Sequence, residues 1–179
     1  MAGVLLAPFV RRRLVVGAIA YAACAAALAS PATDKVIENV RLPTGFKLEL
    51  YADDVPAARS MAMGARGTLF VGTRSGKVYA VSGTPGGAGK SKPQVRVIAD
   101  RLNRPNGVAF RDGALYVAAV NRILRYDAIE SSLDSVPEPK VVRDDLPKDA
   151  HHGWKYIAFG PDGKLYYMEI GRASCRERV

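Results

Sequence analysis

The chain has 179 residues, of which 49% are hydrophobic, and a formal net charge of +9. Apart from three arginines at 11–13 and the basic residues of the last eleven positions, its basic residues are spread along the sequence. Only Lys90 and Lys92 lie close together, in a glycine-rich stretch, so the basic patch expected of a nucleic-acid-binding protein is missing. Both cysteines, Cys24 and Cys175, lie near the ends. Because the central region has no cysteine, it can form no disulfide, thiol catalytic site or cysteine-based zinc site.

Residues 1–29 have the pattern of a cleaved secretory signal peptide. Three arginines at 11–13 precede an uncharged run over 14–28, and Ala27-Leu28-Ala29 supplies the small residues of a cleavage site. The alternative, a membrane anchor, needs about 20 apolar residues, and this run is shorter. We therefore expect an exported protein, periplasmic or secreted, with no stable membrane span after cleavage.

Residues 169–179 differ abruptly from the strand pattern that precedes them. They resemble the in-frame translation of a common sequencing-library adapter, so we expect the natural protein to continue beyond Met168. Without the three arginines of the signal peptide and this basic tail, the formal charge falls to about +5. The natural region in hand then runs over residues 30–168, which is long enough for one domain with a core.

The central region is rich in Val, Tyr, Leu and Gly, and it repeats. Similar units occur at 59–72, 106–118 and 155–167, and their central leucines, Leu69, Leu115 and Leu165, are 46 and 50 residues apart. Each unit reads as an apolar strand, a tight turn and a second apolar strand, with Gly or Asp-Gly at the turn. Repeats of 40 to 50 residues are typical of β-propellers.

Further alternating stretches complete each repeat. In chain order we expect a leading arm over 35–42, a lone outer strand over 46–51, and strands at 77–81, 95–99, 122–126 and 140–143. Residues 57–59 and 82–92 read as loops. Four strands per repeat make a propeller blade. We predict an all-β fold, a β-propeller of which about two and a half blades are present.

Loops that lead into the innermost strand of each blade meet at the mouth of the central channel. Arg59, Asn106 and Lys155 occupy equivalent positions there, and the loop before Lys155 holds both histidines and the single tryptophan: His151, His152 and Trp154. A histidine can accept a proton near neutral pH. The alternatives are a turn histidine bonded to backbone and a tryptophan that packs between blades. Adjacent histidines on a strand point to opposite faces, so we assign no metal ligand.

Three stretches carry a family resemblance: His-His-Gly-Trp-Lys-Tyr-Ile-Ala-Phe-Gly-Pro-Asp-Gly-Lys-Leu-Tyr, Arg-Pro-Asn-Gly-Val-Ala-Phe and Val-Asn-Arg-Ile-Leu-Arg-Tyr. Over residues 40–167 the chain resembles the sorbosone-dehydrogenase-like branch of the soluble PQQ-dependent sugar dehydrogenases. The resemblance implies an exported six-bladed propeller that holds pyrroloquinoline quinone (PQQ) and calcium at the channel mouth. It also implies an aldose or sugar aldehyde as substrate and a separate electron acceptor as partner.

The resemblance also implies roles for single residues. The family histidine that lies eight residues before a Gly-Pro-Asp turn corresponds to His152, which makes His152 the catalytic base. His151 stands where the glucose dehydrogenases have an acidic substrate contact, and we assign His151 and Trp154 to substrate binding. Arg59, Asn106 and Lys155 are our candidates for cofactor binding. The family's calcium ligands, and most of its quinone ligands, would lie in later blades.

Two other functions remain open at this point. A propeller lactonase would bind a divalent metal at the mouth through Glu, Asn and Asp, and Asn106 is a plausible ligand. A non-catalytic propeller that binds carbohydrate or protein is the other alternative, because propellers serve many functions.

Overall fold

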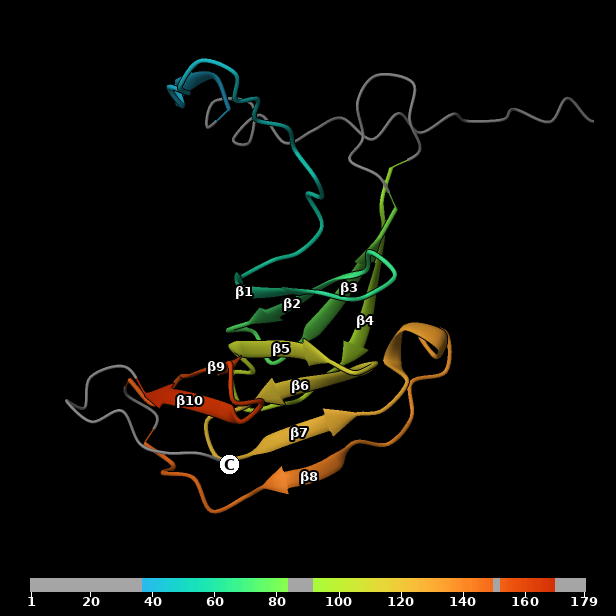
Figure 1. Ribbon diagram of the computed structural model, residues 1–179, viewed down its shortest axis with the longest axis vertical. Coiled ribbons are helices and arrows are strands. Elements are labelled where there is room, and N and C mark those ends of the chain that lie inside the picture. The colour runs from blue at the N-terminus through green and yellow to red at the C-terminus, as the bar shows by residue number, and fades with distance from the viewer. Residues whose placement is uncertain (1–36, 84–91, 150–151, 170–179) are drawn as a thin grey trace, which may run out of the picture.

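The computed structural model describes residues 37–83, 92–149 and 152–169, and these are nearly all β (Figure 1). The predicted signal peptide, the adapter-like residues 170–179 and His151 lie outside the described residues. The strands are β1 (Ala58–Met63), β2 (Leu69–Thr73), β3 (Val78–Ser82), β4 (Gln94–Ala99), β5 (Gly107–Arg111), β6 (Ala114–Ala118), β7 (Ile123–Tyr126), β8 (Lys140–Arg143), β9 (Lys155–Phe159) and β10 (Leu165–Glu169).

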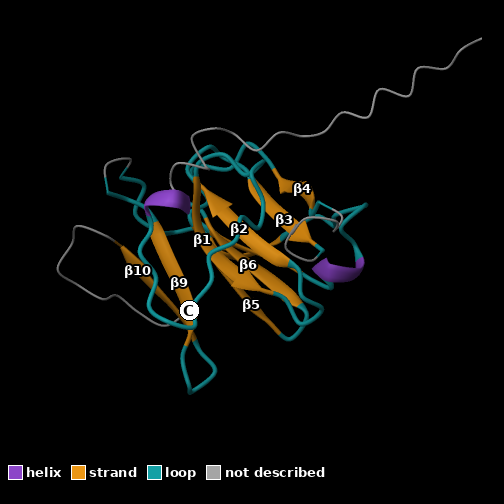
Figure 2. Ribbon diagram, turned by 90° about the horizontal axis from the view of Figure 1, so that it is seen from above, coloured by secondary structure: helices purple, strands orange, loops and turns teal. Residues whose placement is uncertain are grey.

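The strands form three antiparallel sheets in which each strand pairs with its neighbour in the sequence. Two sheets have four strands, in the orders β1-β2-β3-β4 and β5-β6-β7-β8, and β9 pairs with β10 in the third. The first strands of the sheets lie side by side, β1 against β5 and β5 against β9 (Figure 2). This arrangement confirms the prediction of two complete blades and the inner hairpin of a third.

The hairpin turns have the backbone conformations that their sequences predict. Between β5 and β6, Asp112 and Gly113 have φ of 49° and 77°, and Arg111 pairs with Ala114 across this two-residue turn. Positive φ at both positions is the mark of a type I′ turn, which matches the twist of paired strands. In the first and third blades the turns end on Gly67 and Gly163, with φ of 84° and 79°.

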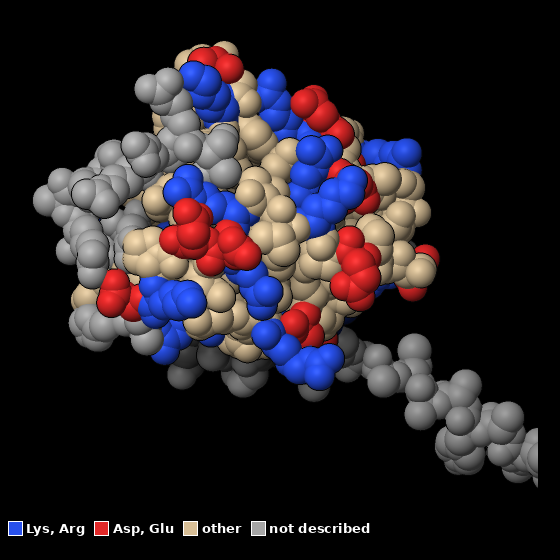
Figure 3. Space-filling model, turned by 90° about the horizontal axis from the view of Figure 1, so that it is seen from below, with Lys and Arg blue, Asp and Glu red and all other residues tan. Residues whose placement is uncertain are grey.

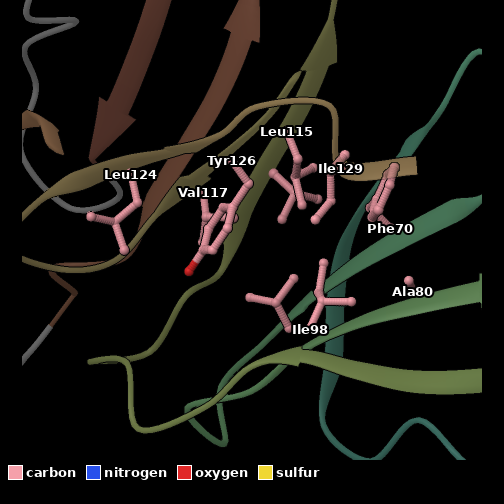
Figure 4. Packing of buried hydrophobic residues seen from close by; sticks show 10 residues of the cluster. Phe70, Ala80, Ile98, Leu115, Val117, Leu124, Tyr126 and Ile129 are labelled. Carbon is pink, nitrogen blue, oxygen red and sulfur yellow. The ribbon is translucent and has the colours of Figure 1, made fainter. Parts of the chain in front are cut away.

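Two apolar cores fill the spaces between blades. The first core joins the first two sheets, and Figure 4 shows members of it from both: Phe70, Val78, Ala80, Ile98, Val108, Leu115, Val117, Leu124, Tyr126 and Ile129. The second core joins the second and third sheets: Ala109, Ala118, Ile123, Leu146, Ile157 and Leu165. Val108 and Ala109 are neighbours on β5 but face different cores, because side chains alternate along a strand.

The segment before β1 differs from the prediction. Residues 37–39 form a short helical segment, and residues 46–51 are not a strand. No strand among the described residues is placed to pair with them, and Phe46 is 72% exposed. The end of this segment instead packs on the free face of the first blade, where Tyr51 and Val55 contact a third apolar cluster. The predicted loop at 57–59 is also shorter, because β1 begins at Ala58.

A short 3-10 helix, Ile129–Ser131, was not expected from the sequence. Ile129 is fully buried in the first core. The Glu130 carboxylate accepts hydrogen bonds from the backbone N–H groups of Arg66, at 3.0 Å, and Thr68, at 3.3 Å. The helix therefore attaches the β7–β8 connection to the β1–β2 turn of the preceding blade.

Candidate mouth of the channel

The structure brings Arg59, Asn106 and Lys155 into one line across three blades. Arg59 lies on β1, Asn106 comes directly before β5, and Lys155 is the first residue of β9. The Arg59 Nε donates to Asn106 Oδ1 at 3.3 Å, and Asn106 Nδ2 donates to the carbonyl oxygen of Lys155 at 3.3 Å. The repeat in the sequence thus becomes a physical connection between blades.

Asn106 is a link between blades and has little exposed surface. It is 5% exposed, and both ends of its amide group are used by the two hydrogen bonds above. The backbone carbonyl oxygen of Asn106 accepts a hydrogen bond from Ser60 Oγ. The same Ser60 Oγ accepts a hydrogen bond from the backbone N–H of Val108 at 3.1 Å. A buried amide with all these partners rigidifies the junction of the first and second blades.

Lys155 is more deeply buried, with no exposed surface. Its Nζ donates to the carbonyl oxygens of Gly153, at 2.8 Å, and Pro147, at 3.5 Å. A buried ammonium must have polar partners, because removing a charge from water is costly. These carbonyl groups belong to the loop between β8 and β9, so Lys155 holds the loop that carries His152.

Two glycines permit the close approach of backbone at this end of the blades. A Cβ at Gly107 would lie 2.5 Å from the carbonyl oxygen of Lys155 in the next blade. A Cβ at Gly153 would lie 1.8 Å from the carbonyl oxygen of Asp149. Both distances are far below contact, so larger residues would force the third blade or the histidine loop to move.

Trp154 is half-buried and lies under two guanidinium groups. The guanidinium carbon of Arg74 is 4.3 Å from the centroid of the indole ring, and that of Arg59 is 5.4 Å away. Both distances are within the range of cation–π attraction. The indole Nε1 is buried, and among the described residues it has no hydrogen-bond partner.

His152 is exposed and lies beside Trp154. The ring centroids are 6.3 Å apart, with an angle of 56° between the planes. The backbone of His152 has φ of 57°, in the left-handed region, where residues other than glycine are uncommon. Five other non-glycine residues among those described also have φ in this region, so this conformation by itself does not mark a functional position. His152 is thus an exposed residue at the end of the blades where Arg59 and Trp154 also lie.

Arg74 is a site residue that sequence reasoning missed. It lies in the turn between β2 and β3, and its backbone N–H donates to the carbonyl oxygen of Ala57 at 3.2 Å. This bond places the turn beside the entry to β1. Turns between the second and third strands of a blade open at the same end as the loops into the first strand, so extending the repeat to residues 73–77 would have found Arg74.

The described residues contain no group of three or more His, Cys, Asp or Glu that could hold a metal ion. Among them there is also no helix long and apolar enough to cross a membrane. Basic and acidic side chains are intermixed on the face that Figure 3 displays. Ion pairs among the described residues join outer strands to loop residues, such as Arg96 to Asp134 and Lys140 to Asp127.

Comparison with protein families and with curated sequences assigns no family to this chain. No family model matches the chain. A protein of Borreliella burgdorferi, described only as uncharacterized, is 25% identical over 93 residues, which are 51% of this chain and 22% of that protein.

Comparison with solved structures is more informative. A Carbohydrate-Active Enzymes Family AA12 protein of Trichoderma reesei, in its iodide structure, matches with a TM-score of 0.55 at 20% identity, over 72% of this chain and 33% of its own. The holo PQQ domain of pyranose dehydrogenase from Coprinopsis cinerea matches with a TM-score of 0.53 at 10% identity, over 65% and 28%. The PQQ-bound aldose sugar dehydrogenase of Streptomyces coelicolor matches with a TM-score of 0.50 at 22% identity, over 66% and 39%.

The chain thus covers between 28% and 39% of the length of these three structures. Identities this low establish a shared fold and nothing finer. The chain has the fold of part of a β-propeller, of the kind found in two sugar dehydrogenases whose structures hold PQQ.

Proposed function

We propose that the chain is the N-terminal part of an exported quinoprotein dehydrogenase that oxidises an aldose or sugar aldehyde with PQQ. The observation that carries the proposal is the position of His152, exposed in a left-handed loop conformation beside Trp154, where three inner strands begin. The proposal includes the division into a signal peptide at 1–29, a propeller at 30–168 and an adapter-derived tail at 169–179.

The residues at the mouth fit part of a PQQ site. PQQ is planar and carries carboxylates. The indole ring of Trp154 offers a planar surface, and the guanidinium groups of Arg59 and Arg74 beside it carry positive charge. The described residues supply no cluster of acidic side chains for calcium. We therefore assign the calcium ligands to blades that follow Met168. When bound, the quinone supplies the two-electron oxidant.

The role proposed for His152 is proton removal. Its imidazole would take the proton from the anomeric hydroxyl of the sugar. The electrons of that O–H bond would form the carbonyl group as hydride leaves the anomeric carbon for the two-electron oxidant. The product is a lactone, or an acid when an aldehyde hydrate is oxidised. The imidazolium then returns its proton to water. Help of this kind contributes about 10²- to 10⁴-fold to rate.

The other residues of the loop would position the base and the sugar. Lys155 fixes the loop through Gly153 and Pro147. The exposed part of the Trp154 ring would contact an apolar face of the sugar. We also propose His151, next to the base in the sequence, as a substrate contact. Since Lys155 and Asn106 are buried, we assign them to holding the mouth together and leave ligand contact to Arg59.

The test is His152→Asn in the quinone-loaded protein that continues beyond Met168. Asparagine tolerates left-handed backbone, so the loop should keep its conformation while the base is lost. We expect turnover to fall at least about 100-fold with PQQ affinity unchanged. Lys148→Asn, an exposed change in the same loop, is the control and should retain full turnover. Near-normal turnover of His152→Asn would dismiss the assignment of the base.

The lactonase alternative depended on Asn106 as a metal ligand. In the structure Asn106 Oδ1 accepts a hydrogen bond from Arg59, and the residue is 5% exposed. We therefore place no metal on it. Lactone hydrolysis without quinone or dye would restore that alternative, and a protein that binds sugar without turnover would support the non-catalytic one.

A further inference from the structure

We propose that Arg59, Arg74 and Trp154 form a carboxylate-binding site beside His152, so that the molecule bound at this mouth is an acid. The carboxylate would belong either to an acidic sugar, such as a uronate, or to the quinone. The choice between these sources rests on the proposed function, but the binding of a carboxylate does not.

The two arginines contact one aromatic ring from different parts of the first blade. Arg59 comes from β1 and Arg74 from the β2–β3 turn, yet both guanidinium groups lie over the same indole ring, at 5.4 and 4.3 Å from its centroid. A guanidinium stacked on an aromatic face keeps its N–H donors in its own plane. Those donors match the two oxygens of a carboxylate.

The charge around these two arginines differs from that around arginines on the outer strands. On the outer strands, arginines have acidic partners: Arg96 pairs with Asp134, and Arg143 pairs with Asp145. Within the part of the chain that the structure describes, neither Arg59 nor Arg74 lies within ion-pair distance of a carboxylate. Two exposed cations held on one ring repel each other, and an anion bound between them would relieve that repulsion.

The indole nitrogen of Trp154 is a further unsatisfied polar group of this cluster. Trp154 Nε1 is buried and, in the described ranges, has no acceptor. An indole N–H left in this way costs free energy, and a hydrogen-bonding partner would recover it. The ring is thus oriented by two cations and lacks an acceptor of its own. The indole ring that carries this unsatisfied N–H also contacts both guanidinium groups.

The experiment uses the fact that Trp154 is the only tryptophan of the chain. Its fluorescence is recorded at submicromolar protein concentration during titration with glucuronate and, in parallel, with glucose. PQQ binding is measured by equilibrium dialysis, because the quinone absorbs in the emission range. The variants are Arg74→Gln, Arg59→Gln and, as a matched control at the opposite end of the blade, Arg66→Gln. Far-UV circular dichroism verifies that each variant keeps the fold.

We expect the acid, and not glucose, to change the emission, and Arg74→Gln to weaken the response at least about tenfold, because a charge-assisted hydrogen bond is lost. Arg66→Gln should leave it unchanged. If glucuronate is silent but Arg74→Gln weakens PQQ binding about tenfold, the carboxylate is that of the quinone. Equal responses to glucose and glucuronate, or acid and quinone binding that ignores both arginine changes, would overturn the proposal. Neither readout needs turnover, so a failed dehydrogenase assay would leave this test intact.

Discussion

The ammonium group of Lys155 illustrates how single residues build the mouth. It has no exposed surface, and it donates to two carbonyl groups of the loop that carries His152. From the sequence, Lys155 looks equivalent to Arg59 and Asn106, because all three precede an apolar strand. Residues at equivalent positions of the repeat need not be equally buried, because the burial of each side chain depends on how the next blade and loop pack against it. The roles of these residues were therefore less predictable than their positions.

We predict that Lys155→Met destabilises the protein. Methionine fills similar space but leaves the carbonyl oxygen of Gly153 without its donor, and a buried unsatisfied group costs about 1–3 kcal/mol. Urea unfolding followed by circular dichroism measures the free energy of unfolding. Lys164→Met, at an exposed lysine in the β9–β10 turn, is the control and should change it by less than about 0.5 kcal/mol. Equal effects of the two substitutions would show that the bonds of Lys155 contribute nothing.

At the level of elements, the hairpins were the most predictable part of the fold. Period-two apolar patterns and Gly or Asp-Gly turns predicted β1–β2, β5–β6 and β9–β10, because local backbone preference and side-chain alternation both act within a few residues. The failures depended on distant partners. The 3-10 helix at Ile129–Ser131 exists beside a turn some 60 residues earlier, which Glu130 binds. In the described ranges no strand pairs with residues 46–51, whatever their own pattern.

The β9–β10 turn carries a pH-dependent contact. The backbone N–H of Lys164, and next the hydroxyl of Tyr166, lower the pKa of Asp162 below its ordinary value. A carboxyl group with a depressed pKa in the folded state stabilises the fold above its unfolded pKa of about 3.9, and this contribution is lost as pH falls through the folded value.

We therefore predict that, below about pH 4, the melting temperature of the unsubstituted chain falls more steeply than that of the Asp162→Asn variant. Asparagine can still accept from Lys164 but has no proton to gain. Thermal melts between neutral and acidic pH, followed by circular dichroism, provide the comparison. Asp127 and Asp145 also have lowered pKa values, but they are common to both proteins. Parallel curves would refute a contribution from Asp162.

On the scale of the whole molecule, the first and third of the described sheets carry exposed apolar side chains. Met61 and Met63, on β1, are 63% and 58% exposed. Tyr156, Tyr166 and Met168 of the third sheet are 48%, 41% and 48% exposed. A blade normally buries both faces on its neighbours, so these exposed apolar surfaces are suited to packing against another sheet.

We predict that the 179-residue chain associates with itself through these surfaces. Replacing both methionines with glutamate should shift the sedimentation distribution towards the monomer, since two charges would have to be buried in the contact. Phe46→Glu is the control. Phe46 lies in the segment that precedes β1, is 72% exposed and belongs to none of the three sheets. A chain that is monomeric without any substitution would contradict the prediction.

The repeat predicted the architecture because a blade is a local meander whose strands follow one another in the sequence. It could not give the chemistry of the mouth in full, since Arg74 and Trp154 meet only when two blades and a loop have packed. The comparisons support the same division. The three solved structures share the propeller fold with this chain at identities of 10–22%. The roles of the residues at the mouth of this chain must be tested on this protein itself.

The most direct test of the central claim is quinone-dependent sugar oxidation by the product of the gene, re-amplified from its source DNA and read through the codon for Met168. Dye reduction is measured with an aldose, with and without PQQ, in the presence of calcium. We predict dye reduction that requires both sugar and PQQ. Dye reduction that ignores PQQ, or no reduction by a folded protein with every aldose tried, would contradict the quinoprotein assignment.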